Sequence, residues 1–335
     1  MKKRFFVGSI CVLLVGGGLK LAPAAISKPS SFSLAQLTNS SQQTVPTAQP
    51  QLELLDPGTE AKQELRFQPA VNAKQTAIMV MDMDLTISIA GNSTPKVNLP
   101  ATEMTMETVV TKVDDNGDIH YQFSYTDVDL VGDESVRPEV REVMREQIRK
   151  VIGLSGSVVI DNRGQTKTVN IVVPENIDES TKQMVEQISD SLKQISSPVP
   201  SQAVGVGAKW RVSSALNLRG ISLSQIATYK LVSLNDDVAT LEISIEQEAP
   251  QQNISLPGIP NGINLTLQSL DAQGQGQLKM SLNQLMPVSY DFSLLSNTEM
   301  SAQRPNIDEP INLEQQLQHF PLLKGTVTAI GKPIS

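Results

Sequence analysis

Residues 108–128 read TVVTKVDDNGDIHYQFSYTDV, two runs of alternating apolar and polar residues joined by a polar stretch that contains Asn116-Gly117. Alternation with a period of two is typical of a strand that buries one face. Asn-Gly between two such runs is the strongest short-range signal for a β-hairpin. The sequence therefore predicts an antiparallel pair of long strands, Glu103–Val113 and Asp118–Val131.

The same alternation continues on both sides of this hairpin. In Ala77–Ile89 every odd position is apolar, which predicts one long strand before the hairpin. A second hairpin, Leu154–Asp161 with Gln165–Val173, is expected to turn at residues 162–164. Later strands are expected at Lys209–Leu218, Ser224–Leu234, Val238–Glu248, Asn264–Asp271, Gly276–Asn283 and Val288–Ala302. Strands this long usually belong to a large, curved antiparallel sheet.

Two segments have the apolar spacing of amphipathic helices instead. Residues 137–152 carry the stripe Val140, Val143, Met144, Ile148, Val151 and Ile152, and residues 178–196 carry a similar one. The predicted fold class is therefore α+β, a half-barrel-like curved antiparallel sheet with two helices packed on one face. Thr108–Val128 can be laid on Thr228–Glu248, and Gly156–Ile160 on Gly276–Met280, both at an offset of 120 residues. This echo indicates either an internal duplication or the general resemblance of amphipathic hairpins.

The N-terminus predicts export. A basic start, an apolar run from Phe5 to Leu19 and Ala22-Pro23-Ala24-Ala25 are typical of a secretory signal peptide cleaved near Ala24 or Ala25. The apolar run is too short for a transmembrane anchor. We divide the chain into the signal, 1–25, a disordered Ser/Gln/Pro-rich leader, 26–61, one β-rich domain, 62–305, and a C-terminal tail, 306–335. The expected location is periplasmic or secreted.

Composition disfavours several classes of function. The formal net charge is −8, and loss of the basic signal makes the mature chain more acidic, so nucleic acid is not an expected partner. The single cysteine, Cys11, lies in the signal, which excludes disulfides and thiol catalysis in the mature protein. The two histidines, His120 and His319, do not lie near a nucleophile motif. We predict no enzyme activity, no catalytic residues, no metal site and no cofactor.

Methionine is the most informative residue in the mature chain. Met79, Met81 and Met83 project to one face of one predicted strand, and Met104 and Met106 project together from the next. With Met144 of the first predicted helix, they are the candidate ligand-binding residues, because methionine packs adaptably against irregular apolar molecules. Ordinary core packing and a thioether site for Cu(I) are the alternatives, although this face adds no His or Cys.

A family resemblance rests on motifs in the second half of the chain. Val204-Gly205-Val206-Gly207 followed by Trp210, then Ala227–Val232, then Gly274-Gln275-Gly276, resemble an uncharacterised family of secreted bacterial proteins that contains a domain of unknown function. The resemblance covers residues 60–302 and implies no active residues. The expected curved sheet also resembles, at the level of the fold, the half-barrels of periplasmic lipoprotein carriers and mycobacterial lipid carriers.

Two functions are therefore open. The first is a non-enzymatic exported protein that binds or carries a lipid or other hydrophobic ligand in a cavity between sheet and helices. The second is a cell-envelope scaffold that interacts with another envelope protein and has no small-molecule ligand.

Overall fold

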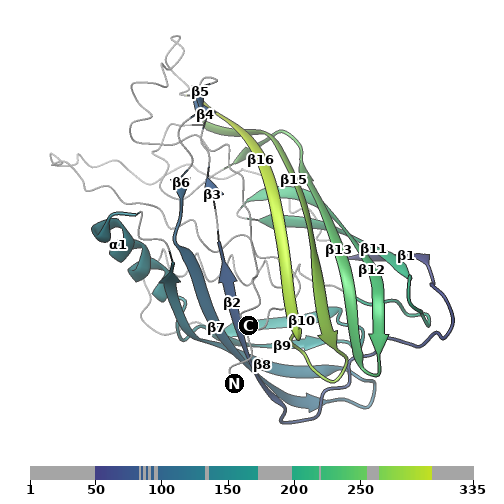
Figure 1. The fold of residues 1–335 in the computed structure, drawn as a ribbon. Helices are drawn as coiled ribbons and strands as arrows, with labels where there is room; N and C mark the ends of the chain where they lie inside the picture. The colour runs from purple at the N-terminus through teal and green to yellow at the C-terminus, as the bar shows by residue number, and fades with distance from the viewer. Residues whose placement is uncertain are drawn as a thin grey trace, which may run out of the picture.

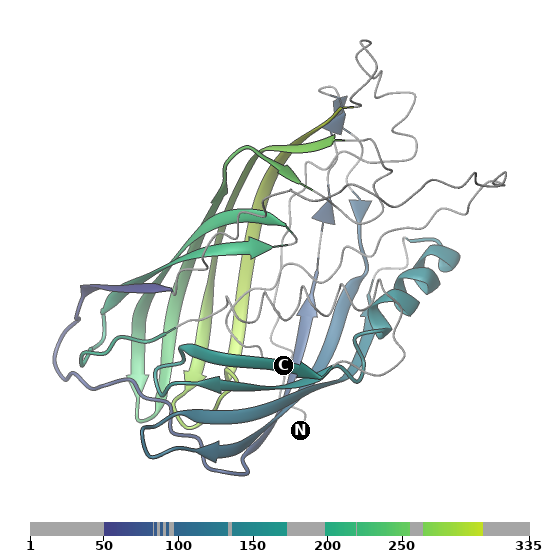
Figure 2. The same cartoon turned by 180° about the vertical axis from the view of Figure 1, so that it is seen from behind.

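The computed structural model describes residues 50–82, 84–85, 88–89, 92–93, 97–132, 136–172, 198–218, 220–254 and 264–303. The predicted signal, the second predicted helix and the C-terminal tail lie outside these residues. Most described residues belong to two antiparallel sheets, which form the two walls of a curled half-barrel (Figures 1 and 2).

The first wall is a five-stranded sheet in which sequential strands lie side by side. Its strands are β2 (Lys74–Met81), β7 (Ala101–Val113), β8 (Ile119–Val131), β9 (Ser155–Ile160) and β10 (Thr166–Val172). The β7–β8 turn is the predicted Asn-Gly hairpin, and Gly117 has a φ of 84° there, in the region that favours glycine. Both predicted hairpins of this half of the chain are confirmed.

The second wall is a seven-stranded sheet. Its strands are β1 (Gln51–Asp56), β11 (Lys209–Leu218), β12 (Ile221–Asn235), β13 (Val238–Ala249), β14 (Gln252–Ile254), β15 (Asn264–Ser281) and β16 (Ser289–Gln303). Along one side of β15, β13 pairs with Leu270–Ser281 and β14 pairs with Leu265–Leu267. Two small ladders are formed by strands of two residues each. In the first, β3 (Asp84–Leu85) pairs with β6 (Val97–Asn98), and in the second, β4 (Ser88–Ile89) pairs with β5 (Asn92–Ser93).

The two walls share strand order and part of their register. The order β2-β7-β8-β9-β10 corresponds to β11-β12-β13-β15-β16, because each is a meander of sequential neighbours. Ile119 pairs with Ile160, and Ala239 pairs with Met280, so both members of the pair are displaced by 120 residues. The echo therefore corresponds to equivalent pairings between β8–β9 and β13–β15, whereas the β7–β8 and β12–β13 hairpins differ by one residue in register at Thr108 and Thr228.

The fold class predicted from the sequence is wrong. Strands account for 63% of the structure and helix for 6%, so the fold is mainly β rather than α+β with two helices. Within the described residues there is one helix, α1 (Pro138–Arg149). It lies beside the end of β8, away from the seven-stranded sheet, rather than across a sheet face (Figures 1 and 2).

The reason for this position is the unequal length of two strands. β9 pairs only with Ile119–Ser124 of β8, which leaves the rest of that edge to be covered. Arg141 donates hydrogen bonds to the carbonyl oxygens of Leu130 and Gly132, each at 3.4 Å. Such cover blocks the unpaired groups of an edge strand. The apolar stripe of α1 therefore packs along an edge, and only part of it is buried.

Three strand boundaries also differ from the prediction. Gln51–Asp56, assigned to the leader, forms β1 because Leu52 and Leu54 pack against the core of the seven-stranded sheet. The strand expected at Ala77–Ile89 ends as β2 at Met81. The two strands expected at Asn264–Asp271 and Gly276–Asn283 are one 18-residue strand, β15.

A segment between β1 and β2 joins the two walls at the base of the half-barrel. The amide of Phe67 donates to the carbonyl of Asn162 in the β9–β10 turn, and the amide of Gln68 donates to the carbonyl of Leu282 after β15, both at 2.7 Å. Leu65, in the same segment, is fully buried in the core cluster of the seven-stranded sheet. One end of the half-barrel is therefore fixed by backbone hydrogen bonds to both sheets.

Candidate functional site: the apolar inner faces

The predicted methionine residues meet on one face of the five-stranded sheet. Met79 of β2 pairs directly with Met104 of β7, and Ala77 pairs with Met106. Directly opposite residues in an antiparallel pair project to the same face. Met104 is 3% exposed, whereas Met79, Met81 and Met106 are half-buried. Met83 lies outside the described residues.

Aromatic and aliphatic residues of β8 extend this face. A bulge opposite Thr105 and Met106 adds one residue to β8, so Tyr125 and Val128 both remain buried although they are three residues apart. Phe123 and Tyr125 contact each other edge to face, with ring centroids 6.2 Å apart. Met144 of α1 packs against the same cluster. Five of the six candidate methionines are thus in one cluster: Met79, Met81, Met104, Met106 and Met144.

Tyr121 is one of the polar residues of this face, which also include the buried Thr102 and Thr108 of β7. Burial raises the pKa of the Tyr121 hydroxyl to about 12, so the group is uncharged at neutral pH. It adds a hydrogen-bonding group without adding charge.

The seven-stranded sheet has an apolar inner face of its own. Trp210, the only tryptophan, is 1% exposed and stacks on Tyr229 with ring centroids 5.5 Å apart. Tyr290 and Phe292 of β16 stack in the same way at 5.8 Å. Burial, with nearby Tyr229 and Asp291, raises the pKa of Tyr290. Trp210 is therefore part of the core of this sheet.

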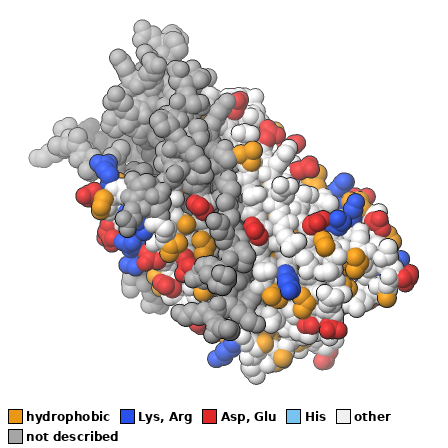
Figure 3. Space-filling model, in the orientation of Figure 1, with side chains coloured by type: hydrophobic (Ala, Val, Ile, Leu, Met, Phe, Trp, Pro, Cys, Tyr) orange, Lys and Arg blue, Asp and Glu red, His pale blue; other side chains and the backbone are white. Residues whose placement is uncertain are grey.

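The inner faces of both sheets are uncharged. Inner positions are those that alternate in step with the buried residues of each strand, and in β2, β7, β8, β9, β11, β12, β13 and β15 none of them is Asp, Glu, Lys, Arg or His. In β10, Lys167 alternates with the buried Val169, but it lies at a register shift, is exposed and binds Asp118. Charged residues of the seven-stranded sheet occupy the opposite positions, where Lys230 and Glu242 form an ion pair at 2.9 Å. Figure 3 shows such side chains scattered over the visible surface.

A row of neutral polar residues crosses the inner face of the seven-stranded sheet. Ser214 pairs with Gln225, Gln225 with Gln247, Gln247 with Ala272, and Ala272 with Ser296. We call Ser214, Gln225, Gln247 and Ser296 the polar row; the apolar Ala272 lies between the last two. The Nε2 of Gln247 donates to the Oε1 of Gln225 at 2.7 Å. The sequence analysis missed the row, although its signal was present as polar residues at positions where the alternation calls for apolar ones.

The cations of α1 are engaged by acidic residues. The Nε of Arg145 lies 2.8 Å from the Oδ1 of Asp129, and its Nη1 lies 2.6 Å from Glu142. Arg149 reaches the other oxygen of Asp129 at 3.3 Å. Burial alone would raise the pKa of Asp129, but hydrogen bonds from Arg145 and the amide of Leu130 hold it below its usual value. These contacts attach α1 to β8.

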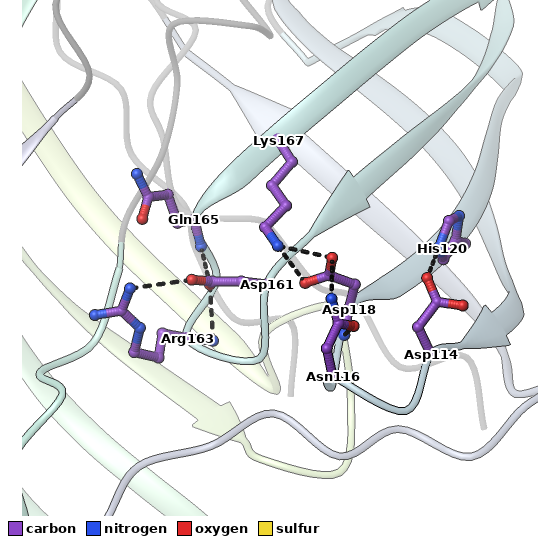
Figure 4. Close-up of polar contacts among 8 residues, drawn as sticks. All are labelled: Asp114, Asn116, Asp118, His120, Asp161, Arg163, Gln165 and Lys167. Atoms are coloured by element: carbon purple, nitrogen blue, oxygen red, sulfur yellow. Dashed lines mark hydrogen bonds and ion pairs between the residues drawn. The ribbon is translucent and has the colours of Figure 1, made fainter.

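A second polar cluster joins the tips of two hairpins (Figure 4). His120 lies 2.7 Å from Asp114 within the β7–β8 hairpin, and Lys167 of β10 lies 2.6 Å from Asp118. Asp161 accepts hydrogen bonds from the backbone amides of Arg163 and Gln165, both at 2.9 Å. The acidic residues shown are therefore bonded to turn amides or neighbouring cations, which is the arrangement of a structural cluster. His319 lies outside the described residues.

The described residues contain no candidate metal site and no candidate membrane-spanning helix. No group of three or more His, Cys, Asp or Glu side chains is placed there to share a metal ion. In the same residues, no helix combines the length and apolar character needed to span a bilayer.

Comparison with known proteins identifies one similar family. The model of a family of unknown function, DUF6263, matches residues 174–286, which include the strands β11 to β15. This similarity supports the predicted resemblance to an uncharacterised domain over that part of the chain. No curated protein and no solved structure matches the sequence or the fold.

Proposed function

We propose that this protein is a non-enzymatic exported protein that binds a lipid or other hydrophobic molecule between the inner faces of its two sheets. The supporting observation is that the buried apolar residues of the two sheets do not form one common core. In a β-sandwich the two inner faces interdigitate to form one core. Here the buried residues of the described sheets form separate clusters, one on the five-stranded sheet and two on the seven-stranded sheet.

The composition of the five-stranded face fits such a ligand. Met79, Met81 and Met106 are half-buried, so part of each flexible side chain is available for contact. Methionine adapts its shape to irregular apolar surfaces and is used where a site must accept flexible molecules. Recognition by this face would depend on apolar contact area rather than on charge.

The proposed location follows from the N-terminal sequence. Residues 1–25 have the pattern of a cleaved export signal, which would release the mature chain into the periplasm or the medium. In those compartments a hydrophobic molecule needs a protein to cross the aqueous space, and a half-barrel with uncharged inner faces would meet that need.

The test combines identification of a ligand with a matched pair of variants. The mature protein, purified from its host without detergent, is expected to release a hydrophobic molecule on solvent extraction and to show its added mass in native mass spectrometry. A ligand at 100 times its Kd stabilises a protein by about 2.7 kcal/mol. For a domain of this size that is a rise of roughly 5–10 °C in Tm.

The variant Met106→Glu places a charge on the inner face, and Thr105→Glu places the same charge on the outer face of the same strand. We expect the first to abolish the rise in Tm and the second to retain it. If no hydrophobic molecule co-purifies and none raises the Tm of the wild-type protein, the proposal fails and the envelope-scaffold alternative replaces it.

A further inference from the structure

The polar row lies between two apolar clusters of the same sheet. On one side are the residues that surround Trp210 and Leu241, and on the other are Leu216, Leu223, Ala249, Ile254, Leu265 and Leu267. Ser214 is 9% exposed, and Gln225 and Gln247 are half-buried. Polar groups in such positions are retained at a cost in desolvation unless they have hydrogen-bond partners.

The chemistry of the row is neutral. The amide of glutamine offers both donors and acceptors, and the hydroxyl of serine does the same. In contrast, the inner positions of β12, β13 and β15 around the row carry no cation that would compensate a phosphate or carboxylate. Burying an ionised group without a partner is heavily penalised.

We infer that the ligand is a neutral lipid whose ester, amide or hydroxyl groups lie against the polar row, with alkyl chains on the apolar clusters to either side. The inference rests on the proposed function and adds the chemical class of the ligand. A neutral acylglycerol has the required order of apolar, polar and apolar parts. An anionic phospholipid has the same chains and adds a charge that the inner faces do not match.

The charges nearest the end of the five-stranded sheet do not change this conclusion. Arg145 and Arg149 bind Asp129, and Arg141 binds backbone carbonyl groups of β8. A phosphate at this end would have to displace those contacts. The five-stranded face itself adds a neutral hydroxyl, that of Tyr121.

The test uses two soluble ligands with the same chains, dioctanoylglycerol and dioctanoylphosphatidic acid. Each displaces the neutral fluorophore N-phenyl-1-naphthylamine from the mature protein, and the competition gives their relative Kd values. We expect the phosphatidic acid to bind at least tenfold more weakly than the diacylglycerol, because its charge loses hydration without gaining a cation.

The polar row is tested by the double variant Gln225→Leu with Gln247→Leu, which keeps side-chain volume and removes both amides. We expect about tenfold weaker binding of dioctanoylglycerol, as for the loss of a buried hydrogen-bonded contact, and unchanged affinity for the fluorophore. Gln273→Leu makes the same change at an exposed outer position of β15 and should leave both affinities unchanged.

The outcomes distinguish failure of the neutral-lipid inference from failure of the proposed binding function. Equal affinity for the two lipids would overturn the assignment of a neutral ligand while leaving hydrophobic binding intact. An unchanged Kd for dioctanoylglycerol in the double variant would overturn the role of the row. Failure of both lipids and of the fluorophore to bind would overturn the proposed function itself.

Discussion

Two glycines in the middle of β15 offer a sharp test of how the inner face is packed. Gly274 and Gly276 project toward Phe292, which is 1% exposed. A Cβ on Gly274 would lie 2.4 Å from the Cζ of Phe292 and 2.8 Å from the Cδ1 of Leu294, both side-chain atoms. A Cβ on Gly276 would lie 2.2 Å from the carbonyl oxygen of Asp291, a backbone atom of the paired strand.

The two alanine variants should therefore respond differently to removal of the ring. Overpacking costs about 1–3 kcal/mol for each glycine variant alone, and Phe292→Ala costs about 3–5 kcal/mol. In Gly274→Ala with Phe292→Ala the added methyl group occupies space that the ring has left, so the double variant should be more stable than additivity predicts by roughly 1–2 kcal/mol. In Gly276→Ala with Phe292→Ala the clashes with the carbonyl oxygen of Asp291 and the Cα of Phe292 persist and only the one with Cδ2 of Phe292 is relieved, so coupling should be clearly smaller than for Gly274.

Urea denaturation of the two double-mutant cycles measures this difference. Trp210 is the only tryptophan and is buried, so its fluorescence reports unfolding of this sheet without labelling. Similar coupling energies for Gly274 and Gly276 would refute the assignment of one clash to a side chain and the other to the backbone.

Three further predictions concern contacts elsewhere in the chain. The side-chain oxygen of Gln75 accepts hydrogen bonds from two backbone amides between β15 and β16, at 2.9 and 3.1 Å; Gln75→Ala should lower the free energy of unfolding by about 1–3 kcal/mol, whereas the exposed Gln122→Ala should not. The hydrogen bond from Lys167 lowers the pKa of Asp118 in the folded state, so this stabilisation is present above the unfolded pKa of about 3.9 and is lost as the pH falls below it. Asp118→Asn should therefore lose less stability between pH 6 and pH 3 than the wild type, measured by urea denaturation; an equal loss would contradict the assignment. Intact mass of the exported protein should show cleavage after residue 24 or 25, and an uncleaved N-terminus would exclude the predicted signal.

Local patterns predicted much of the β structure because the alternation within one strand already shows which of its residues are buried. The Asn-Gly turn, the hairpin at 162–164 and the strand Lys209–Leu218 agree with the structure. The methionines also fall together as predicted, since Met79 and Met104 are direct cross-strand neighbours. Alternation within a strand and pairing across a hairpin are local properties, so a single sequence contains the information.

The errors arose where a distant residue decides the local structure. The break expected at residues 272–275 is absent, because β15 pairs with β16 throughout this stretch, and Phe292 of β16 fills the space beside Gly274 and Gly276. The apolar stripe of α1 suggested cover for a sheet face, whereas the helix covers the edge that the short β9 leaves open. Neither outcome follows from periodicity, because each depends on a neighbouring strand that the local pattern does not identify.

The comparison of the two halves explains why the polar row belongs to one wall only. Under the shared offset, Gln225 and Gln247 of the row correspond to Thr105 and Asp127, which also pair with each other. In β8 the bulge beside this pair turns Asp127 outward, whereas β12 and β13 pair without a shift there, so both glutamines face inward. The same pairing thus faces solvent on one wall and the interior on the other. A charge is tolerated at the first position and would be buried at the second, which is the physical reason that the inner position carries a neutral amide.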